Sequence, residues 1–231
     1  MSGAVGAAIF RPDVVLFDWD NTLVENWGSI RSALNEALAA YGQPPMTLDQ
    51  VKHQGRHSAR DIFPSLFGEE WRPAREIFLA HLKEYHLAGL SVMPGAEAAM
   101  DALGERDVAL GIVSNKNREL LRREIDHLGW AGRFASVVGA QDAPADKPDP
   151  APVRLALDTM GIASKKNVWL VGDTDIDMRT AVAAGCLPIL VGTAMERPDL
   201  FADAKPVLIC ADCNELAGFV RSLWDTICQR S

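Results

Sequence analysis

The sequence predicts an α/β fold, in which a parallel sheet carries helices on both faces and an all-helical block is inserted after the first strand. Two patterns predict this fold. From residue 92 onward, short apolar runs alternate with amphipathic segments, as in the strand–helix units of a parallel sheet. Between residues 27 and 90, by contrast, the periodicity is helical and no convincing strand occurs. The chain therefore divides into a core of residues 1–25 and 92–231 and a helical insertion of residues 26–91.

The first strand is the apolar run Val14–Phe17, and three helical segments follow it. An amphipathic helix is predicted over Ser29–Tyr41, because its apolar residues recur on one face. Thr47-Leu48-Asp49-Gln50 has the capping-box pattern that starts a second, short helix. A third helix is predicted near residues 73–86, so the whole insertion is helical.

The second half of the chain supplies the rest of the sheet. Strands are predicted at five places: Val108–Val113, residues 136–138, Asn167–Val171, Leu187–Val191 and Val207–Cys210. Helices are predicted before, between and after them, ending at Leu103, Leu128, Met160, Ala184 and Ile227. This alternation of strands and helices predicts a sheet that is covered on both faces.

The composition excludes several classes of protein. With 31 acidic and 23 basic residues the formal net charge is −8, and no run of Lys or Arg offers a nucleic-acid surface. No apolar run approaches the roughly 20 residues of a membrane span, and the first residues lack the basic segment of a signal peptide. We therefore expect a protein that binds a small molecule rather than nucleic acid or a membrane. A cytoplasmic location and a monomeric or homodimeric state are further predictions.

The four cysteines do not predict a metal or redox site. Cys210 and Cys213 have the spacing of a zinc or redox pair, but the chain offers no second pair of ligands to complete a zinc site. We interpret the cysteines as thiols in a reducing compartment.

Two carboxylates, Asp18 and Asp20, follow the first strand directly. Carboxylates this close repel each other unless a cation lies between them or one of them holds a proton. Other polar residues follow the later strands: Ser114, Asn115, Lys147, Asp173, Asp175 and Asp177. Because ligands of a parallel sheet bind at the carboxyl ends of its strands, we expect these residues on one rim. Carboxylate oxygens there suit Mg²⁺, and a lysine and a hydroxyl suit the oxygens of a phosphoryl group.

Four short motifs stand in order along the chain: Asp18-Trp19-Asp20-Asn21-Thr22-Leu23, Ile112-Val113-Ser114-Asn115, Lys147-Pro148, and Val171-Gly172-Asp173-Thr174-Asp175-Ile176-Asp177. In this order, on strand ends and with a helical insertion after the first, they resemble the haloacid dehalogenase-like (HAD) superfamily. The resemblance is to its phosphoglycolate-phosphatase-like members, and it covers nearly the whole chain. It implies a Rossmann-like core with residues 26–91 as a C1-type cap. Asn21 departs from the usual Gly, but Asn tolerates the left-handed backbone of such a turn.

The resemblance implies a Mg²⁺-dependent phosphatase that forms an aspartyl-phosphate intermediate. Asp18 would be the nucleophile, and Asp20 would protonate the leaving oxygen and then activate water. Ser114 would bind a phosphoryl oxygen, and Asn115 beside it would also bind the substrate. Lys147 would neutralise charge on the nucleophile and the phosphate.

The resemblance also implies where the metal binds. Mg²⁺ would be held by four aspartates: Asp18, Asp173, Asp20 through its backbone carbonyl, and Asp177 directly or through water. The basic segment 52–60 is either a solvated helix face or a cap loop that binds the far end of the substrate, since Arg suits a carboxylate or a second phosphate. Its candidate residues are Arg56, Arg60 and His57. At the level of the family, the expected substrate is phosphoglycolate.

Some residues have a second interpretation. Lys116 follows the second motif and rivals Lys147 as the charge partner, although the Lys-Pro context favours Lys147. The acidic run after residue 172 is not a calcium loop, because Met178 and Ala184 stand where such a loop needs Gly and Glu. Asp175 is interpreted as a solvated or helix N-terminal carboxylate. Packing or surface positions are expected for Trp19, His81 and His86.

Three other functions are weighed against a phosphatase. A phosphomutase similar to β-phosphoglucomutase would transfer the phosphoryl group to a second sugar hydroxyl, and product analysis distinguishes it. A catalytically silent binding protein of the same fold is disfavoured by the intact motif residues Asp18, Asp20, Lys147 and Asp173. A 2-haloacid dehalogenase is disfavoured because that branch does not need an acid/base at the position of Asp20.

Overall fold

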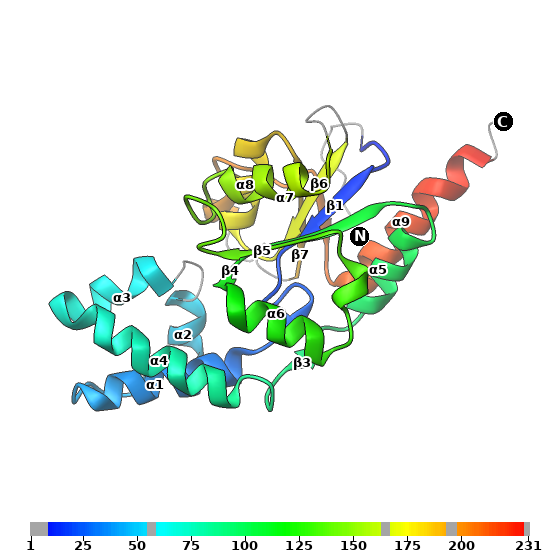
Figure 1. Cartoon of the computed structure of the whole chain (residues 1–231). Helices are drawn as coiled ribbons and strands as arrows, with labels where there is room; N and C mark the ends of the chain where they lie inside the picture. The colour runs from blue at the N-terminus through cyan, green and yellow to red at the C-terminus, as the bar shows by residue number, and fades with distance from the viewer. Residues whose placement is uncertain (1–8, 55–58, 163–166, 193–197, 229–231) are drawn as a thin grey trace.

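The fold is that of a computed structural model, which describes residues 9–54, 59–162, 167–192 and 198–228. The side chains of residues 53, 59–61, 198 and 226–228 lie outside that description. Two parts are visible in Figure 1: a sheet with its flanking helices, and a block of helices beside one end of the sheet.

A parallel sheet of six strands forms the first part, in the order β5-β4-β1-β6-β7-β8. Its strands are β1 (Val14–Phe17), β4 (Ala109–Asn117), β5 (Ser136–Ala140), β6 (Val168–Gly172), β7 (Leu187–Val191) and β8 (Leu208–Cys210). β1 lies between β4 and β6, and all four of its residues are buried. An apolar strand buried on both faces is typical of the centre of a parallel sheet. The predicted strands are confirmed.

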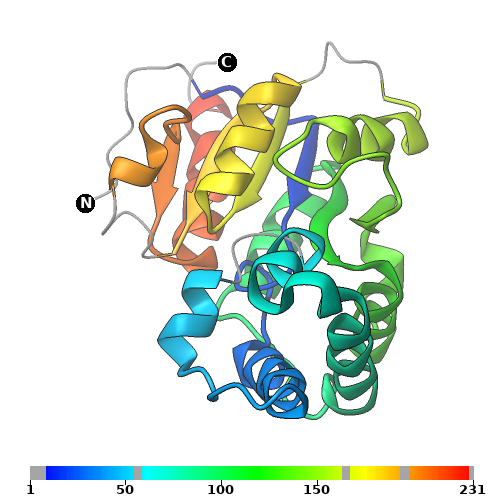
Figure 2. The ribbon, with the colours of Figure 1, turned by 90° about the vertical axis from the view of Figure 1, so that its left-hand side faces the viewer.

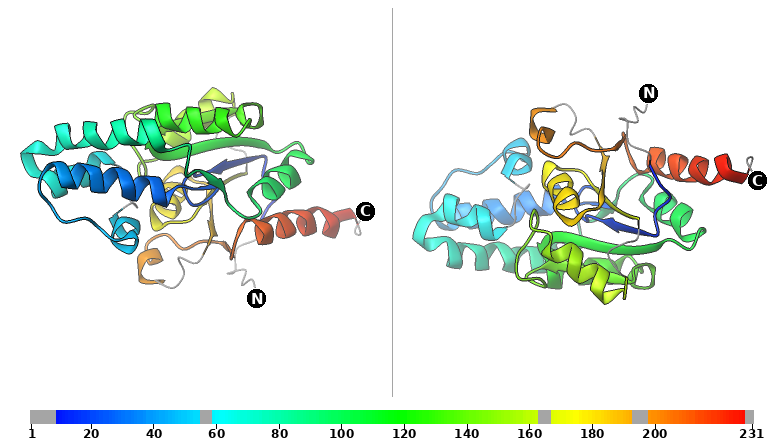
Figure 3. Two further views of the ribbon diagram at one scale, coloured as in Figure 1. Left: turned by 90° about the horizontal axis from the view of Figure 1, so that it is seen from below. Right: turned by 90° about the horizontal axis from the view of Figure 1, so that it is seen from above.

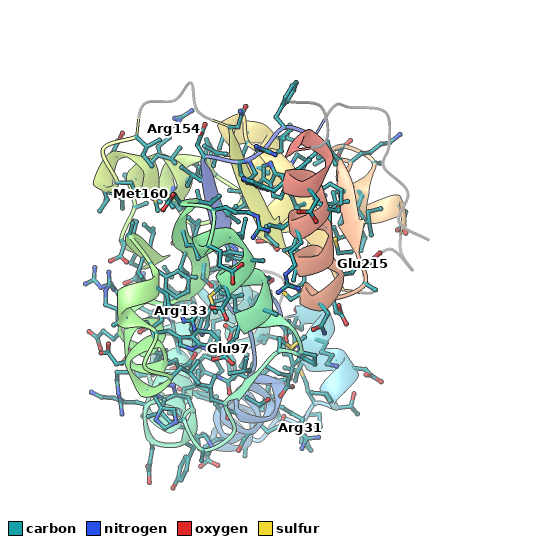
Figure 4. The ribbon with its side chains drawn as sticks, turned by 90° about the vertical axis from the view of Figure 1, so that its right-hand side faces the viewer. Arg31, Glu97, Arg133, Arg154, Met160 and Glu215 are labelled. Carbon is teal, nitrogen blue, oxygen red and sulfur yellow. The ribbon has the colours of Figure 1, made fainter. Side chains whose placement is uncertain are left out.

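Helices cover both faces of the sheet, as Figure 3 shows from below and from above. They are α5 (Ala96–Gly104), α6 (Arg118–His127), α7 (Ala151–Thr159), α8 (Asp175–Ala184) and α9 (Cys213–Cys228). Val15 and Phe17 of β1 share an apolar cluster with α5, α6 and α9, whereas Val14 and Leu16 share one with α7 and α8. Figure 4 views the face covered by α5 and α9. Successive side chains of a strand point to opposite faces, so β1 supplies both layers of the core.

The helical block consists of α1 (Trp27–Ala40), α2 (Leu48–Gln54), α3 (Ala59–Phe67), the 3₁₀ turn η1 (Gly68–Glu70) and α4 (Trp71–Tyr85). Its helices lie together below the sheet in Figure 2. They pack around an apolar core that includes Leu34, Leu38, Phe63, Phe78 and Leu82, and α6 adds Leu120 to it. This hydrophobic cluster therefore holds the block together and also joins it to α6.

Two of its helices illustrate where sequence patterns succeed and fail. α2 begins with the predicted capping box: the Thr47 backbone N–H donates to Gln50 Oε1 at 2.8 Å, and the Gln50 N–H donates to Thr47 Oγ1 at 3.3 Å. The sequence did not predict α3, because Pro64 lies inside it and proline usually interrupts a helix. The helix forms nevertheless, and the rings of Phe63 and Phe67, one turn apart, stack 5.2 Å from each other in the core.

Two short strands join the helical block to the sheet. β2 (Val24–Glu25) and β3 (Ser91–Val92) pair in antiparallel, with Val24 opposite Val92. Strands of two residues are too short for an alternating pattern to predict them. The pair brings the two connections of the block side by side, and the predicted fold class, an α/β sheet with an inserted helical cap, is confirmed. None of the helices among the described residues is long and apolar enough to cross a membrane.

β4 runs further than predicted and places a lysine at the end of the sheet. The sequence predicted its end at Ser114 and Asn115, but the strand continues to Asn117. The Asn117 side chain accepts hydrogen bonds from the backbone N–H groups of Glu119 and Leu120, at 3.0 and 3.3 Å, and so caps α6. Lys116 therefore stands just before the helix. The described residues also include the 3₁₀ turns η2 (Ala131–Arg133) and η4 (Pro198–Phe201).

Candidate functional site

A cleft of about 530 Å³ is lined by residues from the carboxyl ends of the strands and from the helical block. Its polar lining includes Asp18, Asp20, Ser114, Lys147 and Asp173. Its apolar lining from the helical block includes Leu34, Phe63, Phe78 and Leu82. The strand-end residues that were expected on one rim therefore do lie around one cleft, except for the fully buried Asp177.

Asp18 stands at the end of β1 and faces a buried lysine. Its backbone N–H donates to the carbonyl of Val171 on β6 at 2.8 Å. Lys147 Nζ lies 2.8 Å from Asp18 Oδ1, and the Lys147 side chain is only 3% exposed. Burial raises the pKa of Asp18 to about 6, against the lowering effect of Lys147. Lys147 alone therefore does not offset the cost of burying this carboxylate.

Asp177 holds Lys147 from the other side. Asp177 Oδ1 lies 2.6 Å from Lys147 Nζ, while Oδ2 accepts hydrogen bonds from the Thr174 backbone N–H at 3.0 Å and the Thr174 hydroxyl at 2.6 Å. Thr174 is the N-cap residue of α8. A Cβ at position 172 would collide with the Asp177 carboxyl group, so this position requires a glycine. The start of α8 thus fixes the Lys147–Asp177 pair.

Three carboxylates form a group that fits a divalent cation. Asp18, Asp173 and Asp177 place carboxylate oxygens within 4.8 Å of one another. Asp173 Oδ1 is buried and has no hydrogen-bond partner among the described residues. Burial, together with the nearby Asp177 and Asp18, raises the pKa of Asp173 well above its usual value. Three carboxylates against the single charge of Lys147 leave an excess of negative charge, and hard oxygen ligands suit Mg²⁺.

Asp20 has a lysine of its own. Lys116 Nζ lies 2.8 Å from Asp20 Oδ1 and 3.2 Å from Oδ2. Burial raises the pKa of Asp20, against the lowering effect of Lys116. The sequence presented Lys116 and Lys147 as rivals for one position, whereas the structure gives each lysine a different carboxylate. Asn21, the next residue, has a φ of 63°, the left-handed conformation expected of it.

Sequence reasoning missed Glu124, a residue of α6 that is fully buried. Its carboxylate accepts hydrogen bonds from Trp19 Nε1 at 2.7 Å and Asn26 Nδ2 at 3.1 Å. It also lies 2.7 Å from His86 Nδ1 and 3.0 Å from Lys116 Nζ. Burial raises the pKa of Glu124, but His86, Lys116 and Trp19 together outweigh it and the net shift is downward. Glu124 is therefore a buried carboxylate at the centre of a hydrogen-bonded network.

A sequence signal for Glu124 does exist. It stands among Leu120, Leu121 and Ile125, which form the buried face of α6. A carboxylate on a buried face requires polar partners. Two of those partners, Trp19 and His86, are fully buried as a packing interpretation expects, but each also contributes a polar contact to Glu124.

Ser114 and Asn115 both lie beside a lysine. Ser114 is buried, and its Oγ accepts a hydrogen bond from the Lys116 backbone N–H at 3.2 Å. The Asn115 amide binds the Lys147 backbone in both directions: Nδ2 donates to the carbonyl at 3.0 Å, and Oδ1 accepts from the N–H at 2.8 Å. Asn115 therefore positions the segment that carries Lys147, a contact that the predicted substrate-binding role did not include.

The helical block contributes a cation that the sequence did not single out. The predicted Arg56 and His57 lie outside the described residues, as does the side chain of Arg60. Arg75 of α4 lines the cleft, and its Nε is buried with no hydrogen-bond partner among the described residues. Its Nη1 lies 3.8 Å from the exposed carboxylate of Glu76. No sequence pattern separates Arg75 from the other arginines of an amphipathic helix.

The remaining expectations have mixed outcomes. Asp175 is the first residue of α8, but it is buried rather than solvated, and Arg179 Nη2 lies 3.3 Å from its Oδ2. His81 hydrogen-bonds Ser32 at an exposed position. Cys210 and Cys213 are free and buried, and burial raises the pKa of each thiol to about 12, which leaves both unreactive thiols at neutral pH.

Comparison with known proteins identifies the family. A model of haloacid dehalogenase-like hydrolases matches residues 15–191, the span that contains all four motifs. The chain belongs to this hydrolase family. Phosphoglycolate phosphatase of Rhodospirillum rubrum is 36% identical over 194 residues, which cover 78% of this chain and 79% of that protein. Phosphoglycolate phosphatase of Cereibacter sphaeroides is 33% identical over 181 residues, which cover 74% of this chain and 81% of that protein.

A solved structure agrees with this assignment. The crystal structure of a HAD-superfamily hydrolase from Ehrlichia chaffeensis is 29% identical, with a TM-score of 0.64, and the match covers 94% of this chain and 100% of that one. The resemblance inferred from the four motifs is confirmed, and the chain is a HAD-like hydrolase.

Proposed function

We propose that this hydrolase is a Mg²⁺-dependent phosphomonoesterase that acts on a small phosphorylated metabolite through an aspartyl-phosphate on Asp18. The observation that carries the proposal is the arrangement of Asp18 and Asp20 around one cleft, each paired with its own buried lysine. Phosphoryl transfer needs a nucleophile, a proton donor and positive charge, and these residues supply them. The relatives named phosphoglycolate phosphatase support the same reaction class.

The proposed reaction has two steps on the protein's own side chains. A carboxylate oxygen of Asp18 attacks phosphorus, the bond from phosphorus to the leaving oxygen breaks, and Asp20 donates a proton to that oxygen. Asp20 then accepts a proton from the water that attacks the aspartyl-phosphate, which releases inorganic phosphate and restores Asp18. Lys147 offsets the charge of Asp18, and Ser114, in the second half of β4, binds a phosphoryl oxygen.

The metal would bind beside Asp18. Asp18, Asp173 and the backbone carbonyl of Asp20 would hold Mg²⁺, which when bound offsets negative charge on the phosphoryl oxygens. The buried Asp173 oxygen without a partner supports this assignment. Both oxygens of Asp177 already contact Lys147 or Thr174, so we propose that Asp177 reaches the metal through water.

The substrate is proposed from the relatives and from one side chain. We propose phosphoglycolate, the substrate in the names of the similar proteins. Its carboxylate needs a cation on the helical-block side of the cleft, and Arg75 lies there. Arg56, Arg60 and His57 stay predictions for the same role.

The domain boundaries belong to the same proposal. Residues 26–91 would form the cap, and residues 1–25 and 92–231 the core. The β2–β3 pair at the two connections supports this division, as does an apolar cluster that comes from the helical block except for Leu120. A cytoplasmic location and a monomeric or homodimeric state stay predictions, as does the lack of nucleic-acid and membrane partners.

The direct test is an Asp18→Asn variant assayed on phosphoglycolate and on an aryl phosphate. Asp18→Asn should abolish phosphate release while the circular dichroism spectrum stays that of the wild type. Asp126→Asn is the matched control, because Asp126 is exposed on α6 and should keep full activity. Near-wild-type turnover by Asp18→Asn would exclude the covalent mechanism. Wild-type protein that isomerises hexose monophosphates without releasing phosphate would indicate the phosphomutase, and no turnover of any phosphoester would indicate a silent binding protein.

A further inference from the structure

A charged network lies behind Asp20, and of its other members the proposed function uses only Lys116, as a positive charge. Lys116 Nζ lies 2.8 Å from Asp20 Oδ1 and 3.0 Å from Glu124 Oε1. The Lys116 side chain is 6% exposed and that of Glu124 is fully buried. The lysine therefore bridges two carboxylates with almost no access to solvent.

Glu124 also holds the loop that carries Asp20. Trp19, the preceding residue, donates its indole N–H to Glu124 Oε2 at 2.7 Å. Asn26, at the other end of the loop, donates from Nδ2 to Glu124 Oε1 at 3.1 Å. One carboxylate therefore fixes Asp20 in two ways, through Lys116 at its side chain and through both flanks of its backbone loop.

The same carboxylate contacts the helical block at its far end. His86 follows the last residue of α4, is fully buried, and places Nδ1 2.7 Å from Glu124 Oε1. Asn26 precedes α1, so Glu124 contacts both the entry to the helical block and the exit from it. Glu124 itself belongs to α6, which packs on the sheet.

We propose that Glu124 is a positioning residue for Asp20, which sets the orientation in which Asp20 donates its proton and links that orientation to the helical block through His86. This inference rests on the proposed function, because it requires Asp20 to be the acid. A residue that only fills space does not need to be a carboxylate, since a buried carboxylate costs free energy unless several donors satisfy it. Four donors converge on this one, and two of them flank the loop of Asp20 in sequence.

The test compares two substrates that differ in their need for an acid. The oxygen of p-nitrophenyl phosphate leaves without a proton, whereas the alkyl oxygen of phosphoglycolate needs one. For Glu124→Gln, we expect kcat/KM on phosphoglycolate to fall about 10²-fold, within the usual range for acid catalysis. The value for p-nitrophenyl phosphate should stay near that of the wild type, because kcat/KM reports only the step that forms the aspartyl-phosphate.

Two further variants complete the experiment. Glu119→Gln, on the exposed face of the same helix, is the matched control and should leave both values unchanged. His86→Gln keeps the Lys116–Glu124 contact and should lower only the phosphoglycolate value, by about tenfold. It also provides a test if Glu124→Gln does not fold.

The outcomes separate this inference from the proposed function. An equal loss on both substrates in Glu124→Gln or His86→Gln, or no loss on either, would overturn the positioning role. Asp20→Asn is measured beside them and should lose activity on phosphoglycolate selectively. If Asp20→Asn leaves the ratio of the two values unchanged, Asp20 is not the acid and the proposed function itself fails.

Discussion

Two buried lysines stand at the cleft, and they differ in what holds them. Lys147 lies between Asp18 and Asp177, and Asp177 in turn caps α8 through Thr174. Lys116 lies between Asp20 and Glu124. The Lys147 cluster is built from the sequence motifs, whereas the Lys116 cluster draws on residues of α6 and of the connections to the helical block.

The charge balance of the two clusters also differs. On the Lys147 side three carboxylates, Asp18, Asp173 and Asp177, face one lysine. In the part of the chain that the structure describes, these three are the carboxylates grouped closely enough to hold a metal ion. On the Lys116 side two carboxylates face one lysine, and Trp19, Asn26 and His86 supply the other contacts to Glu124. The excess negative charge of the first cluster suits a cation and a phosphoryl group, while the second cluster suits a side chain that must keep one orientation.

Removal of divalent metal should have the largest effect. Excess chelator should abolish phosphate release, because the Lys147 cluster then lacks the charge that offsets its carboxylates, and added Mg²⁺ should restore the activity. A circular dichroism spectrum recorded in chelator checks that the fold persists. Undiminished activity in excess chelator would contradict the metal assignment.

The next effect separates the two lysines directly. Lys147→Met should lower kcat/KM about 10²–10³-fold on both aryl and alkyl phosphates, because charge beside the nucleophile stabilises every substrate's transition state. Lys116→Met should lower the alkyl value far more than the aryl value. Steady-state kinetics on p-nitrophenyl phosphate and phosphoglycolate measure both, and the same pattern in the two variants would remove the distinction between the clusters.

Arg75 should affect substrate choice and leave the chemical step intact. Arg75→Gln should raise KM for phosphoglycolate roughly tenfold or more, since a charge-assisted hydrogen bond contributes about 1.5–3 kcal/mol. KM for ethyl phosphate, which lacks the carboxylate, should not change. Arg72→Gln, at an exposed position of the same helix, is the control. Equal KM changes for the two substrates would show that Arg75 does not recognise the carboxylate.

The smallest effect concerns stability on the Lys147 side. Thr174→Ala should lower the free energy of unfolding by about 1 kcal/mol, because it removes the hydroxyl that caps α8 and binds Asp177. Urea unfolding measures this change, with Thr47→Ala in the exposed capping box of α2 as the comparison. Thr47→Ala should leave activity unchanged, whereas Thr174→Ala should reduce it slightly because Asp177 loses a partner. An inactive Thr47→Ala variant would contradict this division.

The two clusters also show what a sequence can predict. The strands and the motif residues at their ends follow from local patterns. The carboxyl ends of parallel strands meet at one edge of the sheet, so the residues that follow the strands lie close together there. The contacts of Glu124 with Trp19, Asn26 and His86 join residues 38 to 105 positions apart, and no local pattern encodes them. The β2–β3 pair and α3 escaped prediction for a related reason, because tertiary packing stabilises both of them. Local patterns argue against them, since each strand has only two residues and the helix contains a proline.

The central claim is that Asp18 and Asp20 have separate roles, and one measurement tests it most directly. Asp20→Asn, mixed with p-nitrophenyl phosphate and Mg²⁺, should release one equivalent of p-nitrophenol per chain in a burst and then turn over slowly. Acid quenching and mass spectrometry should find the phosphoryl group on the peptide that contains Asp18, because the base that activates water is missing. Steady turnover without a burst, or a phosphoryl group on another residue, would contradict the account.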